Sequence, residues 1–427
     1  GERREQSTRY IAYDNRLDSG HYRYFRPIEI LDSPFGARYI GDMDRVFDTY
    51  GALLPAMRSW VADRFPQQAG DSDFVYRQAV KAKSLDALRG LLPAASLSNI
   101  GLYGTGQSYE QLLLRMRAHP LPEARTYADM MLTELRKVIP SFLQRVDVAE
   151  RGGEWTAYLA ATRDDTARVV DRLWPDDQAG ATDATDATGD TGDPPAELTL
   201  LDFDPEGEDK VLAAVCFSQS SCSEAEALRR VRLLSGEDRV ALLAAYVGER
   251  TNRRHRPGRA FERTDYRFEL VTDYGAFRDL QRHRMLTIEW QRLGIALGYD
   301  MPELVADAGV SDSYRATIDR AEDLFRTLQP HFPEQASYAV ALAHRIRYVM
   351  QCNAREAMHL IELRSGPQGH PAYRRVAQQM HRAIAEQAGH HAIAAAMTFV
   401  DHGATELERL ESERRAERRR REKSPTH

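Results

Sequence analysis

Apolar residues recur at intervals of three and four positions over long stretches of this chain, which is the spacing of one face of a helix. The pattern predicts helices in five windows, at 125–147, 223–248, 313–328, 336–364 and 371–399. Pro330, Pro333 and the Gly366-Pro367 pair fall between these windows, where helices are expected to end. We therefore expect a mainly helical chain.

Strand-like patterns are confined to the middle of the chain. Two apolar pieces lie within 198–217, namely Leu-Thr-Leu-Leu-Asp-Phe and Val-Leu-Ala-Ala-Val-Cys-Phe, and residues 264–272 alternate Tyr266, Phe268 and Leu270 with polar residues. Alternation of this kind is typical of a strand with one buried face. The fold class expected is α+β with helix dominant.

Two polar segments and a weak repeat suggest how the chain is organised. Residues 175–197 repeat Ala-Thr-Asp without a large apolar side chain and read as a linker. The tail at 403–427 mixes both signs of charge, which favours a solvated extension over a nucleic-acid arm. Arg115 with His119-Pro120 and Arg364 with His370-Pro371 each join an apolar helix to a second helix. We expect modules at 20–174 and 198–402, unless the likeness is chance between arginine-rich hairpins.

Composition narrows the class of protein. The 427 residues are 42% hydrophobic and carry a net charge of −6, with 53 Arg against 5 Lys, so general coating of nucleic acid is not expected. The longest apolar run, Val240 to Val247, is too short to span a bilayer, and the first residues do not resemble a secretory signal. Three cysteines give no disulfide framework, which indicates a cytoplasmic protein. Codon bias explains most of the arginines, but guanidinium groups also bind phosphates and carboxylates.

The densest candidate chemistry lies between Arg253 and Gly294. This segment contains His255, Phe261-Glu262 and then Arg282-His283-Arg284, which sets a cationic fork on each side of an imidazole. Such a fork suits a phosphate, a carboxylate or an electron-rich ring. Taken alone, the three residues also fit a helix end that carries surface charges.

The order of these motifs resembles the flavin-dependent thymidylate synthases. That family combines Arg-His-Arg with a preceding His-x-x-Pro-Phe-Glu-like segment and an aromatic strand, and it has a later Asn-Ala-Arg helix that ends in Leu-Arg. The chain has Asn353-Ala354-Arg355 and, nine positions after Arg355, Arg364. The opening Leu-Asp-Phe-Asp and the Val211-Leu-Ala-Ala-Val piece also resemble the family's first strand and helix. The likeness covers roughly 198–400 and implies the same fold, duplicated if the repeat is real.

The resemblance implies roles for individual residues. Those expected to bind FAD are Arg282, His283, Arg284, Asn353, Ala354, Arg355 and His359, the last at a usual Asn position. Arg364 would face the pyrimidine and help to polarise it as the catalytic residue. Those expected to bind the nucleotide are Arg282, Gln281, Thr287, Arg292 and, from the N-terminal half, Arg89. The plainer alternatives are a satisfied core histidine for His359 and a helix-end charge for Arg364.

The chain also departs from the family pattern. After Arg284 the family has a Ser, an Asn-Glu pair and a second Ser, whereas this chain has Thr287 and then Glu289-Trp290. The Arg-x-x-Leu-Pro expected near 337–341 is absent there and occurs instead as Arg89-Gly-Leu-Leu-Pro93, followed by Thr105-Gly-Gln where the second half has Asn-Ala-Arg. Because the family builds each site from more than one subunit, the two modules of this chain would divide the site.

The function implied is reductive C5 methylation of dUMP or a related uridine nucleotide, by a cytoplasmic flavoprotein with FAD, methylenetetrahydrofolate and NADPH. We expect a homo-oligomer that acts on a small molecule, without a membrane or nucleic-acid polymer as partner. The alternative is a diverged homologue that binds flavin or nucleotide without synthase activity, or serves as a scaffold. His370, His381 and the His390-His391 pair lack ligand spacing, so no metal site is predicted.

Overall fold

The computed structural model describes residues 2–5, 11–69, 71–174 and 195–403. Most of the predicted linker and nearly all of the predicted tail therefore lie outside the described residues. The chain forms two compact units: the first comprises Gly1–Trp60, Ser84–Thr191 and Leu293–Leu342, and the second Val61–Lys83, Gly192–Arg292 and Ala343–His427. The module boundaries expected from the sequence stay a prediction.

The second unit is built on a four-stranded antiparallel sheet. Its strands are β3 (Leu198–Phe203), β4 (Asp265–Asp273), β6 (Arg345–Asn353) and β5 (Thr287–Trp290), in that spatial order. Alternate residues of the two central strands are buried, Tyr266 and Phe268 on β4 and Tyr348 and Met350 on β6. The alternation predicted for 264–272 is confirmed, because this period of two gives the sheet one apolar face.

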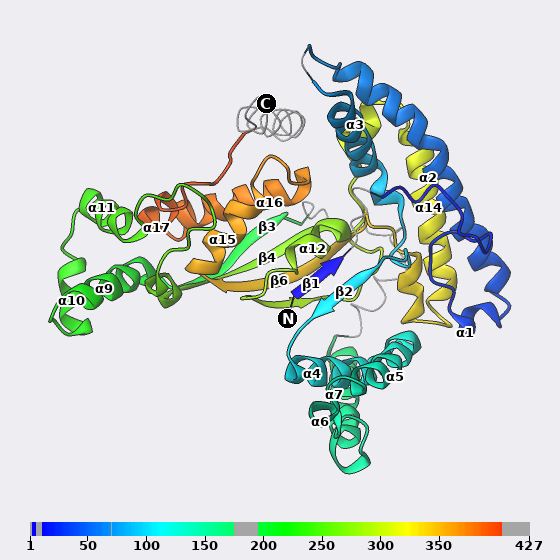
Figure 1. The fold of residues 1–427 in the computed structure, drawn as a ribbon, viewed down its shortest axis with the longest axis horizontal. Coiled ribbons are helices and arrows are strands. Elements are labelled where there is room, and N and C mark those ends of the chain that lie inside the picture. Colours follow the sequence, from blue (N-terminus) through cyan, green and yellow to red (C-terminus); the bar gives the residue numbers. More distant parts are fainter. Residues whose placement is uncertain (1, 6–10, 70, 175–194, 404–427) are drawn as a thin grey trace, which may run out of the picture. The chain divides into compact units, whose positions relative to one another are not determined.

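Seven α-helices accompany this sheet within the described part of the second unit. They are α9 (Gly207–Gln219), α10 (Glu224–Val231), α11 (Gly236–Val247), α12 (Tyr274–Leu280), α15 (Ala354–Arg364), α16 (Pro371–Arg382) and α17 (His391–Ala395). Helices α12, α15 and α16 lie against the sheet (Figure 1). A 3-10 turn, η3 (Arg259–Arg263), precedes β4, and a π-helical turn, η5 (Ala383–Gln387), follows α16.

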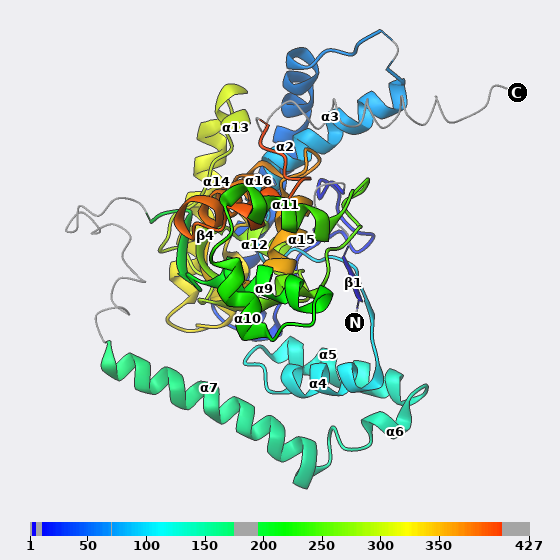
Figure 2. The same ribbon diagram turned by 90° about the vertical axis from the view of Figure 1, so that its left-hand side faces the viewer.

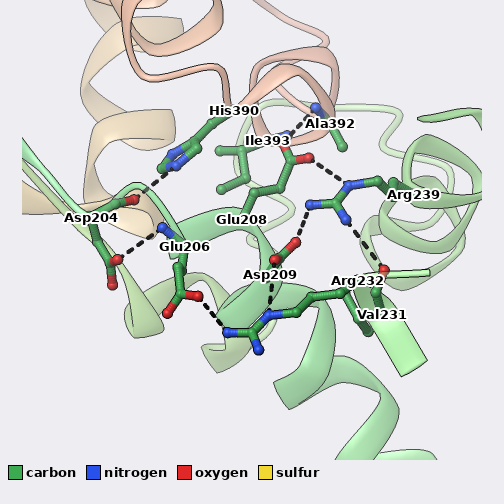
Figure 3. A network of polar contacts seen from close by, with 10 residues as sticks. All are labelled: Asp204, Glu206, Glu208, Asp209, Val231, Arg232, Arg239, His390, Ala392 and Ile393. Carbon is green, nitrogen blue, oxygen red and sulfur yellow. Dashed lines mark hydrogen bonds and ion pairs between the residues drawn. The ribbon is translucent and has the colours of Figure 1, made fainter. Parts of the chain in front are cut away.

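A buried carboxylate ties three helices of this unit together (Figure 3). Glu208 of α9, which is 6% exposed, accepts the backbone N–H groups of Ala392 at 2.7 Å and Ile393 at 3.2 Å, and it accepts Arg239 Nε of α11 at 3.2 Å. Beside it, His390 Nε2 lies 3.0 Å from the carbonyl oxygen of Asp204. The carboxylate thereby satisfies two donors at the start of α17, which is where helix N–H groups have no partner in the helix itself.

Within its described residues, the first unit is helical apart from one short ribbon, β1 (Glu2–Glu5) paired with β2 (Ile100–Tyr103). Its helices include α1 (Ile28–Leu31), α13 (Glu303–Asp307) and α14 (Ser311–Leu328), with the turns η1 (Arg89–Leu91) and η4 (Gln335–Ala339). Helices α2 (Gly36–Arg64) and α3 (Asp73–Leu88) contribute residues to both units. In α14, seven residues at helical spacing are buried, which confirms the predicted helix at 313–328.

Within the first unit, α4 (Gly106–Arg117), α5 (Pro122–Arg136) and α6 (Pro140–Leu143) share a small apolar core that includes Leu113, Leu132 and Leu143. After the π-helical turn η2 (Ala149–Gly153), α7 (Glu154–Leu173) runs beside them (Figure 2) and is held to the end of α4 by Arg163, which donates to the Ala118 carbonyl at 2.5 Å. The predicted helical window at 125–147 is thus interrupted, because Pro140 begins a new short helix.

The Arg-x-x-Leu-Pro segment at 89–93 and the stretch at 337–341, where the second half was expected to carry that motif, pair with each other inside the first unit. Pro93 stands opposite Ala341, Ala94 donates to the Val340 carbonyl at 2.8 Å, and Leu342 donates to the Leu92 carbonyl at 2.9 Å. These residues lie in Arg89–Pro93 and its counterpart at 337–341 or directly after them. Equivalent residues thus meet in an antiparallel pair, as expected of two copies related by a local twofold axis.

Two predicted elements are wrong in type, and two more windows, besides 125–147, are wrong in extent. Residues 345–353 form β6 rather than helix, because half-buried arginines alternate there with fully buried Ile346, Tyr348 and Met350. The piece at 211–217 lies in α9, as the family resemblance implied, since a short apolar run does not distinguish strand from helix. The windows at 223–248 and 371–399 are each divided, by residues 232–235 and 383–390. In the part of the chain that is described, no helix is both long and apolar enough to cross a bilayer.

Candidate functional site

A hollow of about 500 Å3, partly open to solvent, lies in the second unit at the N-terminal end of α15. Its lining is rich in guanidinium groups and holds two carboxylates and two thioethers. The lining residues are Arg250, Arg253, Arg256, Pro257, Glu262, Met285, Asn353, Arg355, Glu356, Met358 and His359. Three of the predicted FAD residues, Asn353, Arg355 and His359, therefore share one pocket.

Asn353 fixes the point where β6 ends and α15 begins. Its side-chain oxygen accepts the backbone N–H of Glu356 at 3.0 Å, which is the bond made by a favoured N-cap residue. The following Ala354 is fully buried and donates its N–H to the Thr264 carbonyl at 2.9 Å. The cap thus directs Arg355, Glu356 and, one turn later, His359 into the pocket.

Arg355 is held by two partners on the segment before β4. Its Nε donates to the Pro257 carbonyl at 2.9 Å and its Nη1 to Glu262 Oε1 at 2.8 Å. Hydrogen bonds from Arg259 and then Arg355 lower the pKa of Glu262 below its ordinary value, so this carboxylate is charged at neutral pH. The pair neutralises Arg355 and fixes the direction of its guanidinium group.

A buried ion pair positions the arginine-rich loop beside the pocket. Arg250 makes two hydrogen bonds of 2.6 Å with the carboxylate of Glu362, and the two side chains are 3% and 0% exposed. The same guanidinium also donates to the carbonyls of Arg253 at 3.2 Å and His255 at 2.8 Å. Arg250 therefore anchors this loop to α15.

Two arginines of that loop keep their positive charge for the pocket. Among the described residues, neither Arg253, which is half-buried, nor Arg256, which is exposed, has a carboxylate partner. Since Arg250 and Arg355 are already paired, Arg253 and Arg256 are the cations that favour an anion here. The N-terminus of α15 adds to this preference through its backbone N–H groups.

Below the pocket, His283 connects Glu356 with Arg364. Its Nδ1 lies 3.0 Å from Glu356 Oε1, and its Nε2 accepts Arg364 Nε at 3.0 Å. Burial is the largest influence on both residues and lowers the pKa of His283 and of Arg364. Arg364 is not a freely solvated helix-end charge, because it is held against His283 and the carbonyl of Asp279, acceptors supplied by the end of α12 and the turn after it.

The other predicted residues lie outside the pocket lining. Arg282 and Arg284 are exposed, and Arg282 donates to the Arg278 carbonyl at 3.0 Å. Thr287 lies on β5 opposite Gln351 of β6, and exposed Arg292 and half-buried Gln281 flank that region. Arg89 is 4% exposed and belongs to the first unit. Their roles stay predictions.

Several pocket residues were given no binding role from the sequence, although Glu262 stood in a motif recognised there. They are Arg250, Arg253, Arg256, Pro257, Glu262, Glu356, Met285 and Met358. Arg253, Arg256 and Glu262 do stand in the segment recognised as dense in candidate chemistry, so their proximity in sequence was a usable signal. Glu356 follows Asn-Ala-Arg directly, and its position in the first turn of a capped helix was a second usable signal in the sequence.

His283, Glu356 and His359 also form a cluster whose possible ligand atoms lie within 4.8 Å of one another. These residues are poorly suited to a metal ion, because both ring nitrogens of His283 already take part in hydrogen bonds, to Glu356 and Arg364. The positive charge of Arg253 and Arg256 in the same pocket also disfavours a cation. The rings of His283 and His359 meet edge to face, with centroids 5.6 Å apart. The arrangement suits an anionic ligand better than a cation.

Comparison with solved structures gives partial likenesses. A UMP/dUMP methylase PolB from Streptomyces cacaoi is 21% identical, with 46% of this chain and 94% of that chain covered and a TM-score of 0.36. Thymidylate synthase X from Helicobacter pylori is 16% identical, with 47% and 98% covered and a TM-score of 0.35.

Comparison with protein sequences covers nearly the whole chain. A UPF0159 protein of Chlamydia muridarum is 34% identical over 412 residues, which are 96% of this chain and 75% of the relative. A UPF0159 protein of Thermoplasma acidophilum is 30% identical over 434 residues, covering 96% and 82%. The family model Thy1, thymidylate synthase complementing protein, matches residues 2–141 and 199–388, as expected of a duplicated module. The chain therefore belongs to the Thy1 family, the flavin-dependent thymidylate synthases.

Proposed function

We propose that this protein is an FAD-dependent enzyme that methylates C5 of a uridine nucleotide, dUMP or a close relative. The observation that carries the proposal is the family match in both halves of the chain, joined to an arginine-lined pocket at the capped start of α15. Methylenetetrahydrofolate as carbon donor and NADPH as reductant belong to the same proposal.

The residues of the pocket fit FAD in charge and in kind. The two cations without a carboxylate partner, Arg253 and Arg256, suit its pyrophosphate, and Asn353 and Arg355 define the helix N-terminus behind them. Met285 and Met358 offer soft apolar surface for a flat ring. We propose that these residues bind FAD together with His359, and that Arg282, His283 and Arg284 border the same site.

When bound, the flavin supplies hydride transfer, and the residues of this chain supply binding and electrostatics. Arg364 would stabilise negative charge that develops on the pyrimidine, because a buried guanidinium acts more strongly in a site from which water is excluded. Gln281, Thr287 and Arg292 are proposed to contact the nucleotide. Arg89 is proposed for the same role, and unchanged nucleotide binding in Arg89→Ala would eliminate it.

A second candidate is a homologue that binds flavin or nucleotide without turnover. The exposed Trp290, in place of a family carboxylate, and the missing second Ser favour this candidate. The pocket itself does not distinguish the two, since both are compatible with bound flavin.

Titration of the purified full-length chain with FAD, followed by absorbance, tests the shared part of the proposal. We expect saturable binding with a perturbed flavin spectrum and, under anaerobic conditions with NADPH, bleaching that dUMP or UMP accelerates. Binding without nucleotide-dependent oxidation in the presence of methylenetetrahydrofolate would support the second candidate. Absence of any FAD uptake would reject the enzyme and the flavin-binding form of the second candidate. Light scattering on the same sample tests the proposed homo-oligomer.

A further inference from the structure

Three side chains joined by hydrogen bonds run from the pocket into the interior of the second unit. Glu356 lines the pocket, His283 is buried behind it, and Arg364 lies beyond at the end of α15. The two joining distances are both 3.0 Å, from Glu356 Oε1 to His283 Nδ1 and from Arg364 Nε to His283 Nε2. Only Glu356 lines the pocket, and these two contacts connect it with His283 and Arg364.

The chemistry of the donors fixes the protonation of the imidazole. A guanidinium Nε–H only donates, so His283 Nε2 must present its lone pair. The single ring proton therefore resides on Nδ1, where it is donated to the carboxylate of Glu356. A protonated imidazole would place an N–H against the N–H of Arg364 and lose that hydrogen bond.

We infer that Glu356 is a positioning residue that sets the direction of Arg364 through the Nδ1–H tautomer of His283. This inference rests on the proposed function, because Arg364 is the group proposed to act on the pyrimidine. Glu356 holds the ring by its Nδ1 proton, the ring holds Arg364 by its Nε2 lone pair, and the carbonyl of Asp279 fixes Arg364 at Nη2.

The position of Glu356 is itself fixed from the backbone. Its N–H is accepted by the Asn353 cap at 3.0 Å, and its side chain is only 11% exposed. Besides its proposed contacts with FAD, the Asn-Ala-Arg motif thus positions the carboxylate of Glu356, the next residue, within hydrogen-bond distance of His283. A side chain without an acceptor at position 356 would leave the Nδ1–H of a buried ring without its partner, which is unfavourable away from water.

Two substitutions separate the hydrogen bond from the charge. In Glu356→Gln the amide oxygen still accepts from Nδ1, so we expect kcat within about threefold of the unchanged protein. In Glu356→Ala the acceptor is lost, and we expect kcat to fall by about tenfold to a hundredfold with a much smaller change in nucleotide KM. Glu237→Ala removes an exposed carboxylate of α11 in the same unit and serves as the matched control.

The tautomer is measured without turnover, by the 15N chemical shifts of the full chain carrying 15N-labelled histidine, with His283 assigned from its disappearance in His283→Gln. We expect the Nδ1–H form at neutral pH, retained in Glu356→Gln and reduced in Glu356→Ala, where only the contact with Arg364 still favours it. An Nε2–H or doubly protonated His283 would overturn the inference, as would equal kcat in the two Glu356 variants. If no variant turns over and the Nδ1–H tautomer is present, the proposed function fails while the positioning contact stands.

Discussion

Replacing Arg250 by Met should destabilise α15 strongly, because it leaves the carboxylate of Glu362 buried without its cation. Both side chains are almost completely buried, and the pair makes two hydrogen bonds of 2.6 Å. In the described chain the carboxylate would retain only the N–H of Phe399, at 3.3 Å. Removing one partner of such a pair costs about 3–5 kcal/mol. We therefore expect amide hydrogen exchange in α15 to accelerate by about a hundredfold to a few thousandfold.

The same substitution should also weaken FAD binding. Arg250 holds the carbonyls of Arg253 and His255, so its loss releases the loop that carries the pocket's uncompensated cations. Hydrogen exchange resolved by mass spectrometry measures the first effect, and titration with FAD measures the second.

Two further variants test the physical reasoning. Arg254→Met changes an exposed arginine of the same loop and should alter stability by less than about 0.5 kcal/mol. The double variant Arg250→Met with Glu362→Leu removes both charges and should be more stable than Arg250→Met alone, since no unpaired carboxylate remains. Unchanged exchange in Arg250→Met would refute the reasoning, as would a double variant less stable than the single one.

Three other predictions concern the pocket, pH and packing. Arg253→Ala should weaken FAD binding by about tenfold and reduce its salt dependence, whereas Arg254→Ala should not, which fluorescence titration at two ionic strengths checks. Burial lowers the pKa of His390, so the folded chain binds fewer protons there than the unfolded chain; stability should fall as pH drops below about 6.5, and His390→Gln should reduce that slope in urea titrations. Gly207→Ala would place a Cβ 2.1 Å from a threonine hydroxyl and should cost about 1–3 kcal/mol in thermal unfolding, while Gly236→Ala, with nothing within 4 Å, should be nearly neutral.

Local patterns predicted part of this fold well. The alternation of Tyr266, Phe268 and Leu270 identified β4, because each of these side chains faces the core directly. Asn353-Ala-Arg identified the start of α15, because an N-cap acts on residues adjacent in sequence. By contrast, the sequence predicted helix where β6 lies. Its apolar residues fit the helical spacing as well as the alternation of a strand, and its arginines are only partly buried.

The site was harder to predict because its decisive contacts join residues far apart in the chain. Arg250 and Glu362 are 112 positions apart, and His283 and Glu356 are 73 apart. No local pattern indicates which of 53 arginines meets a buried carboxylate. The family resemblance supplied the motifs, whereas the partners that set their charge and direction required the structure.

The most direct test of the central claim is the product formed by the full-length protein with FAD, NADPH, methylenetetrahydrofolate and dUMP, analysed by mass spectrometry. We predict a nucleotide heavier by one methylene, carrying its new methyl group on C5. Its formation should depend on FAD and should be abolished in Arg364→Ala. Recovery of unchanged dUMP by a protein that has bound FAD and accepts electrons from NADPH would contradict the claim.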